Sequence, residues 1–575
     1  MSSALFVSLV LLAVLAALVS GRLEPKAVFP GALLLFVLTG QIEMEDVLGH
    51  FTNPALVSLV LLLVLSPVLE KTLFVEWVGQ RILGLKYQGT LSRLGLFTAL
   101  LSAFLSNTAV VASLMGRINV SKQFLPSKLL IPLSYAAILG GTVTLVGTST
   151  NLIVNSFVLG AGLPSLGFFD FLPVGVAATA VGLLVMVVLG DRVLPEYPRG
   201  ERSSREYFLE TQVERGSPLV GRTIEENQLR ALRTLFLVEI YRDNQLISPV
   251  APTEVIRAED ILLFTGDVGE VEQLEQIPGL RFVSDMRPIE QTRLVEVIVS
   301  GFSSLAGKTV REAEFRAKFN AAVVAIARGD QRLSGKIGDL RMHTGDALLL
   351  AVGDDFDTLS HGDHNFHLVN GQVKRERLNG WRSVAVVASF FGGLAAVAAG
   401  WVPLLDLLVF LLAAYLACGF THLKELRGRF PFALMAIIGS ALALSQVMVD
   451  SGVTAAIAEA IVALVDGNGV WFGFFAIYLM TVLLTEFITN NVAASVAFPI
   501  AFGFAEGFGV SPMPFIMAVA YGASASFVTP YGYQTNLMVY SAGRYRFTDF
   551  VRLGLPLSLV YSLVVLVLIP LVFPF

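Results

Sequence analysis

The chain has 575 residues, of which 55% are hydrophobic and 15% are charged. So few charged side chains cannot solvate the surface of a water-soluble globular protein of this size, and the composition therefore indicates an integral membrane protein. The formal net charge of −5 gives no sign of a nucleic-acid partner, and the single cysteine, Cys418, excludes an intramolecular disulfide.

Apolar runs of the length that crosses a bilayer, about 17 to 25 residues, predict a polytopic α-helical membrane protein. The first run has no basic segment before it and no convincing cleavage site, so it is predicted to be a retained helix and not a signal peptide. In chain order the predicted spans lie near residues 4–20, 27–40, 53–69, 127–159, 171–190, 383–399, 402–420, 431–449, 512–541 and 553–573.

Lysine and arginine are distributed unequally between the loops that join these runs. None occurs in 41–52, 160–169, 450–470 or 504–511, whereas the intervening loops contain several. Because short basic loops stay on the cytoplasmic side, we expect a multi-pass protein of the cell inner (plasma) membrane with both termini outside. Residues 195–378 are then cytoplasmic.

Two apolar stretches carry a similar short polar sequence. FLSNTAVVAS (104–113) and FITNNVAASV (487–496) each place three hydrogen-bonding side chains side by side in apolar surroundings. The predicted topology closes only if residues 91–116 and about 468–503 enter the membrane and return on the same side. Both are therefore predicted re-entrant hairpins with the polar residues at the tip, where non-helical backbone must be buried in protein or line a cavity.

The two halves of the chain align further along as well. GTSTNLIVN (147–155) corresponds to TPYGYQTNLMVY (529–540), and each motif interrupts an apolar run. Asp170 and Asp549 follow at helix starts and are predicted N-caps. Five crossings in each half predict two inverted repeats with re-entrant hairpins and broken helices, the architecture of secondary transporters, whose sites lie at the repeat interface.

The interrupted segments have the chemistry of an ion site. A helix that begins inside the membrane presents free N–H groups and the positive end of its dipole, which suits an anion. The hydroxyl and amide oxygens of Ser106, Asn107, Thr489 and Asn490 suit a small hard cation. One polar trio alone is more often an interhelical hydrogen-bonding cluster, but two trios at equivalent positions favour a site.

Glu486 lies near the second trio and is an ionisable residue at hairpin depth, which makes it a functional candidate. Its counterpart in the first half is Ala103. Two roles are equally open for Glu486: involvement with an ion or proton, and a structural role as the partner of a neighbouring helix.

The four motifs in this order resemble the divalent anion/sodium symporter family, within the wider ion transporter superfamily. The resemblance covers about 1–195 and 380–575, and it implies a homodimer that works by an elevator motion with sodium as the coupling ion. Dicarboxylate carriers of this family typically show Ser-Asn-Thr in both hairpins. The second hairpin here shows Thr-Asn-Asn, which favours a compact oxyanion such as sulfate.

The resemblance also implies which residues bind substrate and sodium. It implies substrate contacts from Ser106, Asn107, Thr108, Thr489, Asn490, Asn491, Thr529 and Pro530. It implies one sodium site from Ser106, Asn107, Gly147, Thr148 and Asn151, and a second from Thr489, Asn490, Thr529 and Gly532.

The segment between the halves is richer in charge and is itself duplicated. SPLVGRTIEE (217–226) corresponds to SSLAGKTVRE (303–312), a spacing of 86 residues, and short alternating strands occur in both copies. This predicts two cytoplasmic α+β domains, at 200–285 and 286–376. They resemble TrkA-C domains, the ligand-binding domains of potassium-conductance regulators, which implies a cytosolic effector such as a nucleotide. A module for dimerisation or folding is an equally open reading.

These features predict a transporter and not an enzyme: a sodium-coupled secondary active transporter of a divalent oxyanion, with sulfate preferred, regulated through the TrkA-C-like domains. The expected partners are the anion, sodium, the lipid bilayer and a second copy of the chain, and no nucleic acid. Two alternatives are a sodium/dicarboxylate symporter and a transport-deficient membrane sensor of a cytosolic ligand. The intact polar motifs favour transport, because a sensor has no reason to keep costly polar groups in the membrane.

Overall fold

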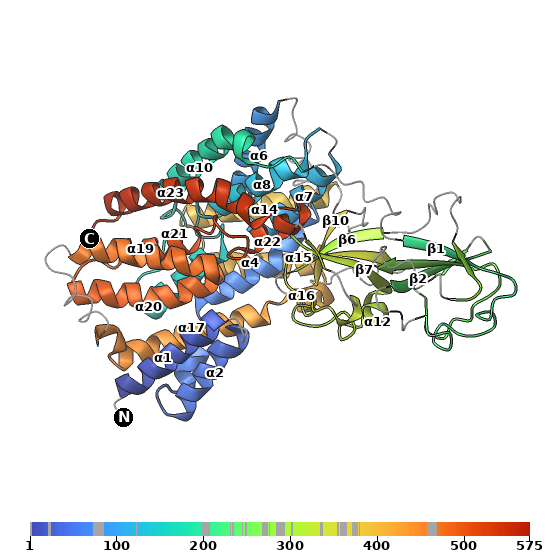
Figure 1. Cartoon of the computed structure of the whole chain (residues 1–575). Coiled ribbons are helices and arrows are strands. Elements are labelled where there is room, and N and C mark those ends of the chain that lie inside the picture. The colour runs from blue at the N-terminus through green and yellow to red at the C-terminus, as the bar shows by residue number, and fades with distance from the viewer. Residues whose placement is uncertain are drawn as a thin grey trace.

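The computed structural model of the chain contains a large helical part and two β-sheets (Figure 1). Of the predicted boundaries of the inserted domains, 200, 285, 286 and 376 lie outside the described residues. The residues that the structure describes are 3–20, 25–72, 86–121, 123–197, 208–229, 232, 235–243, 245–247, 250–266, 274, 277–282, 294–300, 303–329, 331–333, 337–352, 356, 365–370, 378, 380–456 and 469–575.

The first half is helical, as its apolar runs predict, because a helix satisfies every backbone N–H and C=O group within its own segment. The predicted run 127–159 is two helices separated by a break at 142–148. The helices are α1 (Ser3–Ser20), α2 (Pro25–Leu38), α3 (Met44–Phe51), α4 (Pro54–Glu70), α6 (Tyr87–Ser102), α7 (Asn107–Val120), α8 (Pro126–Gly141), α9 (Ser149–Gly160) and α10 (Leu172–Val193).

The second half repeats this pattern. The predicted run 512–541 is again two helices, with a break at 524–533. The helices are α14 (Trp381–Ala398), α15 (Leu404–Ala417), α16 (Leu423–Arg429), α17 (Phe432–Asp450), α19 (Gly469–Phe487), α20 (Asn490–Phe508), α21 (Met513–Ala523), α22 (Gln534–Ala542) and α23 (Phe547–Val572).

Six described helices are long and apolar enough to cross a membrane, and a seventh span results if the bent pair α3 and α4 counts as one. Helix α23 shows the pattern: Leu557 and Tyr561 are buried, whereas Leu559, Leu563 and Leu571 are more than half exposed. An exposed apolar stripe of this length suits lipid and not water. The chain is therefore a multi-pass helical membrane protein, as the composition predicts.

The two predicted hairpins are each a pair of helices joined by a short turn. Residues 103–106 join α6 to α7, and Ile488 and Thr489 join α19 to α20. The helices of each pair pack against one another. That these pairs re-enter the membrane instead of crossing it stays a prediction.

The predicted N-cap roles of Asp170 and Asp549 are wrong. Phe171 and Arg546 occupy the N-cap positions of α10 and α23. Asp549 lies at the third helical position, where its carboxylate accepts the backbone N–H of Arg546 at 2.8 Å. A polar residue near a helix start does not fix the first helical residue, because neighbouring positions can satisfy the same free N–H groups.

The segment between the halves contains two five-stranded antiparallel sheets. Their strand orders are β3-β2-β4-β1-β5 and β10-β6-β9-β7-β8, which is one order read in opposite directions. The strands are β1 (Phe208–Val213), β2 (Leu235–Arg242), β3 (Gln245–Ile247), β4 (Ile261–Gly266) and β5 (Leu280–Phe282), then β6 (Leu294–Val299), β7 (Ala321–Arg328), β8 (Gln331–Arg332), β9 (Ala347–Val352) and β10 (Phe366–Asn370), with α12 (Phe315–Phe319) and the 3-10 helix η3 (Ile337–Asp339).

The two sheets pack on each other and lie at one end of the molecule. Val238 and Leu263 of the first sheet share an apolar cluster with Val324 and Leu349 of the second. In Figure 1 the sheets lie at one end of the helical part, and both termini lie toward the opposite end. The second sheet is the nearer one, since β10 packs against α7 and β6 against α22.

Candidate functional site

Four helices begin inside the helical part, at the positions that the sequence motifs mark. Ser106, Thr148, Thr489 and Tyr533 are the N-caps of α7, α9, α20 and α22, and all four have extended backbone. Ser106 Oγ accepts the N–H of Ala109 at 3.2 Å, whereas the N-cap side chains of α9, α20 and α22 form no capping hydrogen bond. The first-turn N–H groups of these three helices are therefore not bonded to a capping side chain.

The tip of the first hairpin contacts the break of the second half. The side chain of Asn107 lies 2.6 Å from the hydroxyl of Tyr533, which also lies 3.0 Å from Thr148 Oγ1. With the Asn107 oxygen turned toward Tyr533, the amide nitrogen donates to the carbonyl oxygen of Gly147 at 3.2 Å. Tyr533 therefore joins the hairpin tip and both breaks, a role that the sequence motif TPYGYQTN did not reveal.

The tip of the second hairpin contacts the break of the first half in a corresponding way. Asn490 Nδ2 donates to Thr150 Oγ1 at 2.6 Å, and Ser149 Oγ donates to Asn491 Oδ1 at 3.0 Å. In the first hairpin, Thr108 Oγ1 donates to Gln534 Oε1 at 3.4 Å, and Thr108 and Gln534 are the counterparts of Asn491 and Ser149. Each hairpin tip is thus hydrogen-bonded to the break of the other half.

Within each half, the break is held by matching hydrogen bonds. Asn151 Nδ2 donates to the carbonyl oxygen of Thr144 at 2.9 Å, and its counterpart Asn536 donates to that of Thr529 at 3.3 Å. Thr144 and Thr529 in turn donate through their hydroxyls to the carbonyl oxygens at the counterpart positions Ala103 and Glu486. These bonds hold the first break against the end of α6 and the second break against the end of α19.

Glycines allow the same close approach in both halves. A Cβ on Gly147 would lie 2.6 Å from the carbonyl oxygen of Gly141, and a Cβ on Gly532 would overlap Ser526 Oγ and the carbonyl oxygen of Thr485. Only glycine fits at either position, because backbone and hydroxyl atoms occupy the space of the side chain. The predicted sodium residues Gly147 and Gly532 therefore have the same packing role.

Glu486 holds the second break by its carboxylate. Its two oxygens accept the backbone N–H groups of Phe527 at 2.9 Å, Val528 at 2.9 Å and Thr529 at 2.8 Å. In the first half, Ala103 stands at this position. There α8 extends past the position at which α21 ends in the second half, and Val143 N–H bonds to the carbonyl oxygen of Gly140 in this last turn. The carboxylate thus supplies hydrogen bonds that an extra helical turn supplies in the first half.

Three buried polar atoms beside the second break have no hydrogen-bond partner among the described residues. They are the hydroxyls of Ser524 and Ser526 and the amide nitrogen Nε2 of Gln534. Burying such atoms unpaired costs free energy, so they are candidate contacts for a bound ion or anion. Sequence reasoning did not identify them, although Ser524 and Ser526 stand five and three residues before the TPYGYQTN motif.

The predicted site residues are only partly grouped as the sequence suggested. Asn107 and Gly147 of the first predicted sodium site lie together, and Thr148 joins them through Tyr533. In the second site, Thr529 bonds to Glu486 at the end of α19, whereas Asn490 bonds to Thr150 of the other half. Pro530 is buried within the second break.

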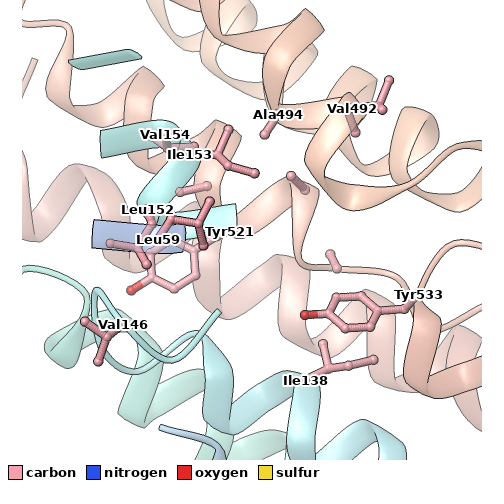
Figure 2. Close-up of a cluster of buried hydrophobic side chains, with 14 of the residues drawn as sticks. Leu59, Ile138, Val146, Leu152, Ile153, Val154, Val492, Ala494, Tyr521 and Tyr533 are labelled. Carbon is pink, nitrogen blue, oxygen red and sulfur yellow. The ribbon is translucent and has the colours of Figure 1, made fainter. Parts of the chain in front are cut away.

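An apolar cluster surrounds these helix starts. Figure 2 shows Leu59, Leu152 and Tyr521 close together at the left, and Val492 and Tyr533 at the right. All five side chains are buried. Because such a wall lowers the local dielectric constant, hydrogen bonds and helix dipoles at the site act more strongly on an ion than they would in water.

Four helix starts with polar residues at their tips, set in a multi-pass helical fold, define the chain as a membrane transporter. Residues 7–520 match the citrate transporter family, and the chain belongs to that family. It is 30% identical to an uncharacterized transporter of Synechocystis over 94% of this chain and 92% of the relative. It is 29% identical to a putative sulfur deprivation response regulator of Chlamydomonas reinhardtii, over 95% of this chain and 98% of the relative. It is also 30% identical to sodium/sulfate cotransporter 1 of Chlamydomonas reinhardtii, over 62% of this chain and 42% of the relative.

Proposed function

We propose that the protein is a sodium-coupled secondary active transporter of a small divalent oxyanion, with sulfate as the preferred substrate. The observation that carries the proposal is the meeting of α7, α9, α20 and α22 at their N-terminal ends, three of them without a capping side chain. The names of the similar sodium/sulfate cotransporters support the choice of sulfate and sodium.

The anion is bound by helix starts in this proposal. Uncapped first-turn N–H groups and the positive ends of helix dipoles favour a tetrahedral oxyanion. The contacts come from the implied substrate residues at the two tips, with Gln534 Nε2 as a further donor. The four motifs contain no lysine or arginine, so the remaining negative charge must be balanced by ions that bind with the substrate.

Sodium supplies that balancing charge. Hydroxyl, amide and carbonyl oxygens are the ligands that a small hard cation prefers, and the two implied sodium sites consist of such groups. The unpaired hydroxyl of Ser526, beside Gly532, adds an oxygen to the second site. Since sodium strengthens the anion site and the anion strengthens the sodium sites, binding of one favours binding of the other.

The inverted-repeat architecture, the elevator motion and the homodimer belong to the same proposal. The paired contacts Thr108–Gln534 and Ser149–Asn491 are what two pseudosymmetric halves would produce. The orientation in the membrane is also proposed: both termini outside, and the sheets, which lie at the other end of the helical part, in the cytoplasm (Figure 1).

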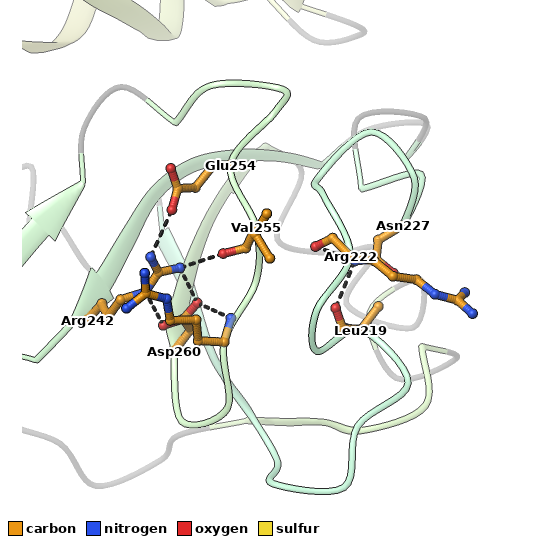
Figure 3. Close-up of polar contacts among 8 residues, drawn as sticks. Leu219, Arg222, Asn227, Arg242, Glu254, Val255 and Asp260 are labelled. Carbon is orange, nitrogen blue, oxygen red and sulfur yellow. Dashed lines mark hydrogen bonds and ion pairs between the residues drawn. The ribbon is translucent and has the colours of Figure 1, made fainter.

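The two sheets are proposed to be TrkA-C-like regulatory domains. Each contains an arginine paired with a buried aspartate: Arg242 with Asp260 at 2.8 Å, and Arg328 with Asp346 at 2.7 Å. Figure 3 shows Arg242 bonded also to Glu254 and to the carbonyl oxygen of Val255. The hydrogen bonds with Asp260 raise the pKa of Arg242 further above its ordinary value, so the arginine stays charged.

A second candidate is a membrane sensor that no longer transports. The relative named a putative sulfur deprivation response regulator favours it, because the similarity covers 95% of this chain. Uptake of labelled sulfate into proteoliposomes, with and without an inward sodium gradient, separates the two candidates. The transporter accumulates sulfate only with the gradient, and competition by excess succinate tests the dicarboxylate alternative. A sensor shows no uptake in either condition.

A further inference from the structure

The second sheet is bonded to the C-terminal end of α22. Ser541 Oγ donates to the carbonyl oxygen of Gly345 and accepts the backbone N–H of Gly329 at 3.4 Å. Ser541 is buried. The N-terminal end of the same helix, at Gln534, lies in the candidate site, about 10 Å away at 1.5 Å per residue.

Both contacting residues are glycines for two separate reasons. Their φ angles are +61° at Gly329 and +86° at Gly345, where side chains are disfavoured. A Cβ on Gly329 would lie 2.5 Å from the ring of Tyr540, and a Cβ on Gly345 would lie 3.1 Å from Cδ2 of Leu537. Side chains on these two turns would therefore push the sheet away from α22.

The first sheet provides an internal comparison. At the corresponding positions, 86 residues earlier, it carries Asp243 and Glu259, also with positive φ angles of +48° and +68°. Both acidic side chains are exposed. The turn geometry therefore does not by itself demand glycine, and what distinguishes the second sheet is its contact with α22.

The two glycine turns are tied together by one ion pair. Arg328 precedes Gly329 and Asp346 follows Gly345, and the guanidinium donates to both carboxylate oxygens at 2.7 and 2.8 Å. A bidentate pair of this kind fixes the relative position of the two turns. A displacement of either turn is then transmitted to the other and to α22.

Apolar packing extends the contact beyond the two turns. Ile298, Ala347 and Val369 of the second sheet are buried in the same apolar cluster as the membrane helices. The β10 strand, which contains Val369, packs against α7, whose first residue is Asn107. The second sheet thus contacts two of the four helices that begin at the candidate site.

We propose that the Gly329 and Gly345 turns are the surface through which the inserted segment controls transport, with α22 as its partner. This inference rests on the proposed function for its effect on transport. A ligand of the inserted segment can alter transport only if it binds more tightly to one arrangement of the turns on α22 than to another. The first sheet, with Asp243 and Glu259 at these turns, does not serve this contact.

The test exchanges the residues at the two turn positions between the sheets, in two separate variants of the full-length protein. One variant carries Gly329→Asp and Gly345→Glu, and the matched control carries Asp243→Gly and Glu259→Gly. Amide hydrogen exchange of residues 537–542 is measured by mass spectrometry together with sulfate uptake. We expect exchange in α22 to rise about tenfold in the first variant, because the clash separates sheet and helix, with altered sulfate half-saturation. The control should match the wild type in both measurements.

A milder variant keeps the proposal testable if the double variant fails to fold. Ser541→Ala removes both hydrogen bonds without a clash, and we expect about a fivefold rise in α22 exchange. Unchanged exchange in α22 for the folded glycine variant, or for Ser541→Ala, overturns the proposal, as does an equal change in the control. If the wild type does not transport sulfate, the proposed function fails, whereas the exchange result still decides whether the turns hold α22.

Discussion

The carboxylate of Glu486 accepts the backbone N–H of Thr529 at 2.8 Å, next to the second hairpin tip and at the start of the predicted sodium-binding loop. The hydroxyl of Thr529 donates back to the carbonyl oxygen of Glu486 at 2.9 Å. This reciprocal pair binds the break of α21 and α22 to the end of α19. It places a carboxylate beside the loop that is proposed to bind sodium.

Replacing Glu486 by Gln should weaken sodium binding in a protein that still folds. The amide nitrogen would face the N–H of Thr529, which leaves two donors opposed and removes the negative charge. We expect the sodium concentration for half-maximal uptake to rise about tenfold. Glu506→Gln, at an exposed position near the end of α20, is the control. An unchanged sodium dependence in Glu486→Gln would show that the carboxylate has no part in ion coupling.

Removing the hydroxyl of Tyr533 should weaken the connection between the first hairpin tip and the two breaks. Tyr533→Phe leaves Asn107 and Thr148 without their shared partner, and we expect about a tenfold loss of uptake with normal folding. Size-exclusion chromatography and uptake assays measure the two effects. Tyr531→Phe, whose residue is 53% exposed, is the matched control two residues away. Equal uptake by the two variants would contradict the role assigned to Tyr533.

The asparagines at the hairpin tips should be essential for transport. Asn107→Ala removes the contacts with Tyr533 and Gly147, and Asn490→Ala removes the bond to Thr150. We expect either variant to fold and to lose transport. Asn119→Ala is the control, because Asn119 lies near the other end of α7, about 18 Å from Asn107 at 1.5 Å per residue. Near wild-type transport by both tip variants would mean that the tips only pack.

Sodium and sulfate should tighten each other's binding by the same factor, because coupling free energy is reciprocal. Isothermal titration of detergent-purified protein gives sulfate affinity in sodium and in choline, and sodium affinity with and without sulfate. We expect sulfate binding to be lost in choline. Identical sulfate affinity in the two salts would rule out sodium coupling.

Acid should destabilise the two sheets through Glu226 and Glu312. A backbone hydrogen bond from Thr223 lowers the pKa of Glu226, and one from Thr309 lowers the pKa of Glu312. A carboxylate with a lowered pKa in the folded state stabilises the fold above its unfolded pKa, and this stabilisation disappears as the pH falls through the folded pKa. Hydrogen exchange of β1 and β6 should therefore quicken as the pH falls below about 4. The exchange rate should rise beyond what the intrinsic pH dependence of exchange accounts for. This additional rise should be absent from the double variant Glu226→Gln/Glu312→Gln.

The sequence by itself determined the class of protein, the approximate extent of the long apolar helices and the position of the breaks, whereas α3 (Met44–Phe51) lies in a predicted loop. Apolar runs become helices because no other local fold satisfies their backbone in an apolar surrounding. GTSTN and TPYGYQTN mark the interruptions at 142–148 and 524–533 because glycine, proline and short polar residues favour non-helical backbone. The 86-residue spacing marks the two inserted copies, whose sheets share one strand order.

The tertiary structure alone decided which polar groups meet. Thr108 meets Gln534 and Asn490 meets Thr150, pairs that are 426 and 340 residues apart. The family resemblance implies a sodium site formed by the second hairpin with the break of its own half, which stays a prediction, whereas the bond of Asn490 to the other half was not predicted. A motif shows which residues have the required chemistry but not which partner the packing brings near. The contact of Gly345 with α22 is likewise set by the docking of one folded unit on another. Local propensity does not specify such a surface, since the matching turn of the first sheet carries Glu259 with a similar backbone.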